Sequence, residues 1–132
     1  KYTDASGAAR GAAELVALLQ EANLRFPGAT AVFPHGPRVL LVSPVTIRKN
    51  AVPEGPFFTH DESLRFAGLY EAVAQASGVH FLDAARYAQP SPEEGTHLLP
   101  EGHAALARAV AEQVRTIFAQ EELEAKTGHA AL

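Results

Sequence analysis

The sequence contains no cysteine, no methionine and no tryptophan among its 132 residues. Without cysteine, the chain forms no disulfide and offers no thiolate nucleophile or thiolate metal ligand. It also lacks a signal-peptide pattern and any apolar run near the roughly 18 residues that a transmembrane helix needs. Positive charge is scarce, because 11 lysine and arginine residues face 15 acidic ones, for a net charge of −4. We therefore expect neither a membrane span nor a nucleic-acid-binding surface, which would be basic.

The size and the apolar content fit a single domain with a buried core, since 47% of the residues are hydrophobic. The first residue is Lys1 and no methionine follows it. We therefore expect further polypeptide upstream, either removed by cleavage or not included in this sequence. The cellular location is left open, with the cytoplasm favoured, because a targeting signal would lie in that upstream part.

Apolar periodicity predicts alternating helices and strands. In chain order we expect a helix over 8–26, a strand over 38–43, a helix over 60–78, a strand over 79–83 and a helix from Pro100. Each strand is a run of mostly apolar residues, which is typical of parallel strands covered on both faces. This alternation predicts crossover connections and helices on the two faces of a parallel sheet. Residues 121–132 form a charged tail that we expect to fray or to extend the last helix.

Capping residues and apolar faces set the expected ends and orientations of the helices. Asp4 or Ser6 can cap the first helix, which should end near Phe26, before a proline and a glycine. Asp61 lies near the start of the second helix and Gly78 near its end. The side chains expected to face inward are Phe66, Leu69, Tyr70, Val73, His103, Leu106, Ala107, Val110, Val114, Ile117 and Phe118.

Two strands are too few for a complete sheet. They leave an unpaired edge on each side and too little apolar surface for three helices. We therefore expect this chain to be the second half of a three-layer α/β domain whose remaining strands belong to other polypeptide.

The stretch EGTHLLPEGHAALARAVAEQV, residues 94–114, resembles the last conserved block of the SGNH (GDSL-type) hydrolases. That block reads Asp-Gly-x-His-Leu, a short turn, then Gly-His and a closing helix. DASGAARGAAELVALLQ resembles the helix after the family's Gly-x-Asn-Asp block, PRVLLVSPVTI its next strand, and GVHFLDAARYA the strand leading into the catalytic loop. The stretch 44–60 resembles the substrate-side insert of arylesterase and acyltransferase members, so the resemblance covers residues 3–118.

The resemblance implies a three-layer α/β/α, flavodoxin-like SGNH hydrolase fold, with residues 1–120 as the C-terminal half of one domain and 121–132 as its tail. It implies a serine esterase that hydrolyses carboxylic esters and uses neither a cofactor nor a metal. The family's nucleophilic serine and its oxyanion donors find no match here and should lie upstream. The expected partners are therefore a small ester and that upstream segment. A homo-oligomer is also expected, through the apolar residues Val52, Pro53, Phe57 and Phe58.

His97 and Glu94 occupy the positions of the family's catalytic base and acid. The base must take the serine proton and return it to the leaving alcohol, and an acid on its other ring nitrogen holds the tautomer. Gly95 between them can adopt a positive φ, which lets one tight turn bring carboxylate and imidazole together. The family's acid is aspartate, and glutamate reaches one methylene further. Glu93 or a backbone carbonyl is therefore an alternative partner, and His97 itself could be a structural histidine at a helix start.

Other candidate residues each have a functional and a structural interpretation. Phe57, Phe58 and His60 are expected to line an acyl pocket, although His60 could equally be a cap or surface residue. Ser43 ends a strand, where α/β folds place functional groups, but it lacks the glycines of a nucleophile elbow. His103 is expected to pack on the inner face of the last helix or to bind the catalytic loop.

Two further hypotheses stay open. A metal site built from Glu94, His97 and His103 is conceivable, but the spacing fits no zinc signature. A non-catalytic α/β module acting in binding or assembly is the alternative to the esterase. The glutamate in place of aspartate favours that module, and the retained Gly-x-His turn favours the esterase.

Overall fold

A computed structural model of the chain describes residues 4–22, 33, 36–52 and 58–129. In chain order its elements are α1 (Ala5–Gln20), β1 (Leu40–Ser43), α3 (His60–Ser63), α4 (Phe66–Ser77), β2 (His80–Asp83), the 3-10 helix η1 (Ala84–Arg86) and α5 (Pro100–His129). The predicted alternation of helices and strands is confirmed, and both strands lie within their predicted ranges.

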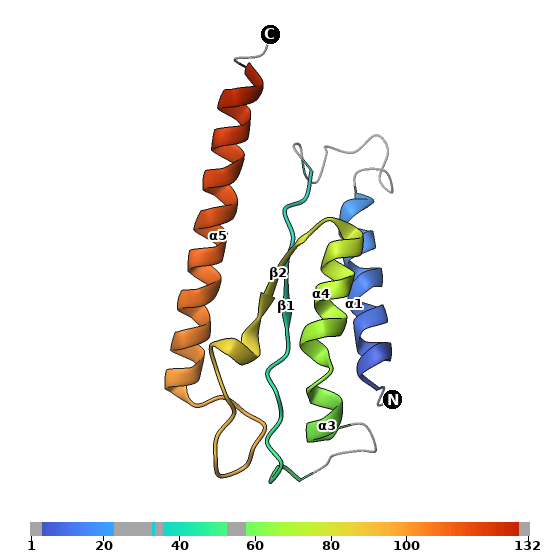
Figure 1. The fold of residues 1–132 in the computed structure, drawn as a ribbon, viewed down its shortest axis with the longest axis vertical. Coiled ribbons are helices and arrows are strands. Elements are labelled where there is room, and N and C mark those ends of the chain that lie inside the picture. Colours follow the sequence, from blue (N-terminus) through green and yellow to red (C-terminus); the bar gives the residue numbers. More distant parts are fainter. Residues whose placement is uncertain (1–3, 23–32, 34–35, 53–57, 130–132) are drawn as a thin grey trace.

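The two strands form a parallel pair in which Leu40 lies opposite His80 and Ser43 opposite Asp83. Figure 1 shows α4 and α1 on one side of this pair and α5 on the other. α4 contacts both strands, and α1 packs on α4. This is the predicted three-layer α/β/α arrangement with a parallel sheet. Within the described residues the sheet consists of these two strands, so each of them has an unpaired edge.

The buried core consists mainly of small residues. Its hydrophobic members are Ala5, Ala9, Val16, Ile47, Ala74, Leu82, Ala84, Ala88, Ala109 and Ile117. The larger side chains predicted to face inward from the second helix are only half-buried: Phe66, Leu69, Tyr70 and Val73. Their partial burial still has an effect, because it raises the pKa of the Tyr70 hydroxyl.

Helix ends follow the predicted capping residues in two cases. The Asp4 carboxylate accepts a hydrogen bond from the Gly7 amide at 2.7 Å and caps α1. Gly78 ends α4 with a φ of 64°, a left-handed conformation that glycine adopts without steric cost. The predicted end of the first helix near Phe26 lies outside the described residues, and Glu21 is the C-cap of α1.

The predicted helix over 60–78 is divided into α3 and α4. Its cap is Thr59, whose hydroxyl accepts from the Glu62 amide, and Asp61 lies in the first turn, near the cap as predicted. The division follows from Ser63, whose hydroxyl donates to the His60 carbonyl at 2.6 Å and accepts from the Ile47 amide at 2.9 Å. Because this buried hydroxyl binds backbone groups on two segments, it competes with the helical hydrogen-bond pattern at that turn.

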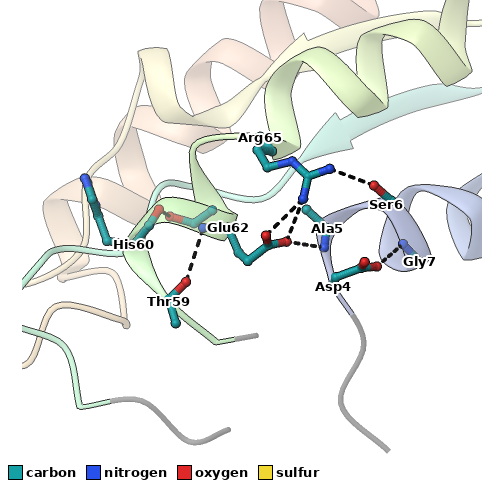
Figure 2. Close-up of polar contacts among 9 residues, drawn as sticks. Asp4, Ala5, Ser6, Gly7, Thr59, His60, Glu62 and Arg65 are labelled. Atoms are coloured by element: carbon teal, nitrogen blue, oxygen red, sulfur yellow. Dashed lines mark hydrogen bonds and ion pairs between the residues drawn. The ribbon is translucent and has the colours of Figure 1, made fainter. Parts of the chain in front are cut away.

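The start of α1 is tied to α3 by an acid that sequence analysis did not single out. Figure 2 shows Glu62 between Arg65 and the first residues of α1. Its carboxylate accepts from the Ala5 amide at 2.8 Å and from Arg65 at 2.9 Å, and Arg65 also donates to Ser6. The Ala5 amide is the main cause that lowers the pKa of Glu62, with Arg65 adding to it. The cluster thus joins two helices through residues that lie 57 positions apart in the sequence.

α5 is 30 residues long and continues through the predicted tail, so residues 121–129 extend the helix. In its second half Glu121 forms an ion pair with Arg38. The Arg38 guanidinium also lies 5.5 Å from the ring centroid of Phe118. These contacts attach α5 to the residues just before β1. Among the described residues, no helix is both long enough and apolar enough to cross a membrane.

The face that α5 turns toward the molecule differs from the prediction. Ala109 and Ile117 are buried. The predicted inward residues that are exposed instead are His103, Ala107, Val114 and Phe118. Of the predicted stripe, Ile117 is buried and Leu106 and Val110 are half-buried, so only part of it faces the rest of the described structure.

Candidate active site

The candidate site lies at the carboxyl ends of β1 and β2, the edge at which parallel α/β sheets bind ligands. Two segments extend from this edge, residues 44–52 after β1 and residues 84–99 after β2. Figure 1 shows them together below the strands, next to the start of α5. Hydrogen bonds between Arg48 and Pro90 and between Asn50 and Pro92 join them.

The His97 loop, residues 90–98, is closed at its neck, where its first and last residues meet, and its middle is hydrogen-bonded back to its start. Pro90 and Leu98 form an antiparallel bridge, and the Ser91 amide donates to the His97 carbonyl at 2.8 Å. The Gly95 amide donates a hydrogen bond to the Ser91 carbonyl at 2.9 Å. Gly95 has a φ of 81°, which confirms the positive φ predicted for it. The loop is therefore a compact turn that is stabilised by its own backbone hydrogen bonds.

Glu94 and His97 meet within this loop. The Oε2 atom of Glu94 lies 2.9 Å from Nδ1 of His97. Its Oε1 atom accepts from the backbone amides of Thr96 and His97. The amide of His97 is the main cause that lowers the pKa of Glu94, followed by its ring. Because an ionised carboxylate can only accept, Nδ1 carries the proton and Nε2 of a neutral His97 is left as an acceptor.

The pair faces solvent, since the His97 side chain is 83% exposed and that of Glu94 45% exposed. Glu93, the alternative acid, is exposed and uses its backbone: its amide donates to the Ser91 hydroxyl at 3.2 Å. Of the two neighbouring acids, the geometry therefore joins Glu94 to the imidazole.

Three other sequence-based interpretations fit the structure poorly. Ser43 is 1% exposed and its hydroxyl donates to Asp83 at 3.3 Å, so a substrate cannot reach it as a nucleophile. His103 is exposed on α5 instead of packing on its inner face, which corrects that prediction. Among the described residues, no three histidine or acidic side chains gather as a metal site would require, so the metal hypothesis for Glu94, His97 and His103 has no support.

His60 and Phe58, predicted to contact substrate, lie beside hollows next to the His97 loop. Nδ1 of His60 donates to the Ile47 carbonyl at 2.6 Å, and Figure 2 shows its ring turned away from the Glu62 cluster. His60, Ile47 and Arg48 line a hollow of about 270 Å³ and a neighbouring one of about 380 Å³, and Phe58 lines the second. Neither hollow is lined by the Glu94–His97 pair. Phe57 lies outside the described residues.

Sequence analysis missed two residues that hold the His97 loop from outside. Arg48 donates from its backbone to the Gly95 carbonyl at 2.9 Å and from Nε to the Pro90 carbonyl at 2.6 Å. The Asn50 side chain donates to the Pro92 carbonyl at 2.9 Å. The only sequence signal was a polar run, Arg-Lys-Asn, inside a stretch rich in apolar residues and proline.

No protein-family model matches the chain, and no curated protein matches it. Solved structures do. The carbohydrate acetylesterase Est24 from Sinorhizobium meliloti is 25% identical with a TM-score of 0.72, over 88% of this chain and 54% of that one. The native aryl esterase of M. smegmatis is 27% identical with a TM-score of 0.70, over 86% and 53% of the two chains. A protein of Agrobacterium tumefaciens str. C58 assigned to the arylesterases is 32% identical with a TM-score of 0.69, over 83% and 50%.

The chain thus spans about half the length of these structures. Over that length the similarity agrees with the parallel strand pair and the helices on its two faces. The resemblance carried by residues 94–114 is confirmed. Over the part of these structures that it spans, the chain is similar to hydrolases of the SGNH family.

Proposed function

We propose that this chain is part of a serine esterase of the SGNH type, in which His97 is the catalytic base and Glu94 the acid that orients it. One observation carries the proposal: the Glu94 carboxylate lies 2.9 Å from Nδ1 of a solvent-facing His97 ring, at the carboxyl edge of the sheet. This contact leaves Nε2 free to act as base. Similarity to esterases supports the same reaction class.

The nucleophilic serine and the oxyanion donors belong, in this proposal, to polypeptide outside the sequence. Nε2 of His97 takes the serine proton while the serine oxygen attacks the ester carbonyl. The resulting imidazolium is stabilised by Glu94 and then protonates the leaving alcohol, which departs from the tetrahedral intermediate. Water then attacks the acyl-enzyme by the same steps. No step requires a metal or a cofactor.

The substrate is a carboxylic ester, and the hollows lined by His60 and Phe58 are where we place its binding groups. Short acyl esters of aryl alcohols or of sugars are the substrates to test first, because the similar structures are arylesterases and a carbohydrate acetylesterase. Self-association of the enzyme is also proposed, since Val52, at the edge of the segment expected to form that interface, is 80% exposed.

A second candidate function, a non-catalytic binding or assembly module, is favoured by one observation. His97 lines neither of the two hollows in which we place the binding groups of the ester. In that case the exposed pair would be a vestige of the family's chemistry.

The two functions are separated by hydrolysis of p-nitrophenyl acetate, measured with the protein as it occurs, after its intact mass has shown which segments are present. His97→Ala should reduce hydrolysis to background, whereas His103→Ala should retain it, because His103 is an exposed histidine on α5 outside the loop. This chain without the nucleophile segment should be inactive. Equal rates for the wild type and His97→Ala would overturn the esterase and favour the module.

A further inference from the structure

Arg48 contacts the His97 loop at two separate points. Its backbone amide donates to the Gly95 carbonyl at the middle of the loop, and its Nε donates to the Pro90 carbonyl at the neck. A third, longer contact joins its Nη2 to the Gln89 side chain at 3.4 Å. One half-buried residue therefore touches both the start and the turn of a nine-residue loop.

The loop depends on such external contacts because its functional side chains are exposed. With 83% of the His97 side chain in solvent, packing does little to fix the ring, and its place follows from the backbone around it. That backbone is bonded to itself through Ser91, which joins Gly95 and His97. A shift at Pro90 or Gly95 is thereby transmitted to His97.

We propose that Arg48 is a positioning residue, whose guanidinium fixes the neck of the His97 loop so that Glu94 stays on the imidazole. The expected effect of Arg48 on catalysis rests on the proposed esterase function. Its expected effect on the contact between Glu94 and His97 does not. Arg48 touches neither of the paired side chains and acts through the backbone. Arginine suits this role because its planar, permanently charged group donates in a fixed direction to a carbonyl.

The test compares Arg48→Gln and Arg48→Lys with a matched control, Arg115→Gln, which makes the same charge change at an exposed position on α5. In the protein as it occurs, amide exchange of Ser91 and Gly95 and the NMR titration of the Glu94 carboxyl are followed, with amides of α4 as the reference for global unfolding. In the esterase that contains the chain, kcat and KM for p-nitrophenyl acetate are measured.

In Arg48→Gln we expect the Ser91 and Gly95 amides to exchange about tenfold faster while the α4 amides are unchanged. The pKa of Glu94 should rise toward its ordinary value of 4.5, because fewer hydrogen bonds from His97 stabilise its charge. In the esterase, kcat should fall by about 10- to 100-fold with KM changed less than about twofold. Arg48→Lys should restore part of each effect, and Arg115→Gln should match the wild type.

Two results would overturn the inference. One is a wild-type exchange rate at Ser91 and Gly95 together with an unchanged Glu94 titration in Arg48→Gln. The other is an equal acceleration of the α4 amides, which would make Arg48 a general stabilising residue. If instead His97→Ala keeps full esterase activity while Arg48→Gln loosens the loop, the proposed function fails and the hold of Arg48 on the pair stands.

Discussion

Replacing Gly95 by alanine should disturb the His97 loop through two separable effects. The first is conformational, since a φ of 81° costs alanine about 1–2 kcal/mol. The second is steric, because the added Cβ would lie 3.0 Å from the Cβ and backbone nitrogen of Ala51. Ala51 follows directly on the segment that binds the loop, so relieving this contact requires a backbone shift and adds about 1–2 kcal/mol. Together they predict a loss of about 2–4 kcal/mol.

Two other glycines serve as matched controls. Gly78→Ala shares the positive φ but has open space around the new Cβ, so it should lose only the conformational part, about 1–2 kcal/mol. Gly68→Ala lies within α4, also with open space, and should gain about 0.5–1 kcal/mol because alanine favours helix. Urea unfolding followed by circular dichroism measures all three variants against the wild type. Exchange of the Ser91 amide is measured alongside, because a loop can also open locally.

From the most to the least stable, the expected order is Gly68→Ala, wild type, Gly78→Ala and then Gly95→Ala. The reasoning is refuted if Gly95→Ala loses no more than Gly78→Ala and leaves exchange of the Ser91 amide unchanged. That result would mean that the His97 loop does not rest on Ala51 at all.

Three further predictions test other parts of the molecule. The pKa of Glu62 is lowered below 4.5, so its contribution to the free energy of unfolding is fully present above pH 4.5 and is lost as the pH falls through the folded-state pKa. Urea unfolding at a series of acidic pH values should show this loss in the wild type and not in Glu62→Gln. Ser63→Ala should reduce the free energy of unfolding by about 1–3 kcal/mol, because it leaves the buried Ile47 amide without its acceptor, whereas an unchanged urea midpoint would contradict the hydrogen bond. Glu94→Gln should lower kcat for p-nitrophenyl acetate on the order of 10²–10⁴-fold, and a matched change at Glu93 should not.

The features that were predicted correctly depend on neighbours in sequence. Both strands were found because their apolar runs are short and bounded by proline or glycine, and Leu40 through Ser43 and His80 through Asp83 pair as expected. The sequence also predicted the contact between Glu94 and His97. The two residues are only three positions apart, and the glycine between them allows the turn that brings their side chains together. Local chemistry of this kind survives folding with little influence from the rest of the chain.

The errors arise where distant residues override a local pattern. A helical period runs through 60–78, yet the Ser63 hydroxyl binds the Ile47 amide, 16 residues away, at the turn where α3 ends. The apolar stripe of α5 predicts that Val114 and Phe118 face inward, yet both are exposed while Ala109 and Ile117 are buried. Periodicity records which residues are apolar, whereas their burial depends on which elements pack against the helix.

The same distinction applies to the candidate site, and it changes which residues matter there. The acid-Gly-x-His turn identifies the chemical groups, but their support comes from Arg48, more than 40 residues earlier in the sequence. An exposed imidazole on a nine-residue loop has few contacts of its own, so its precision must come from the backbone that carries it. Substitutions in residues 48–51 should therefore affect the pair almost as strongly as substitutions beside it, although nothing in that segment resembles a catalytic motif.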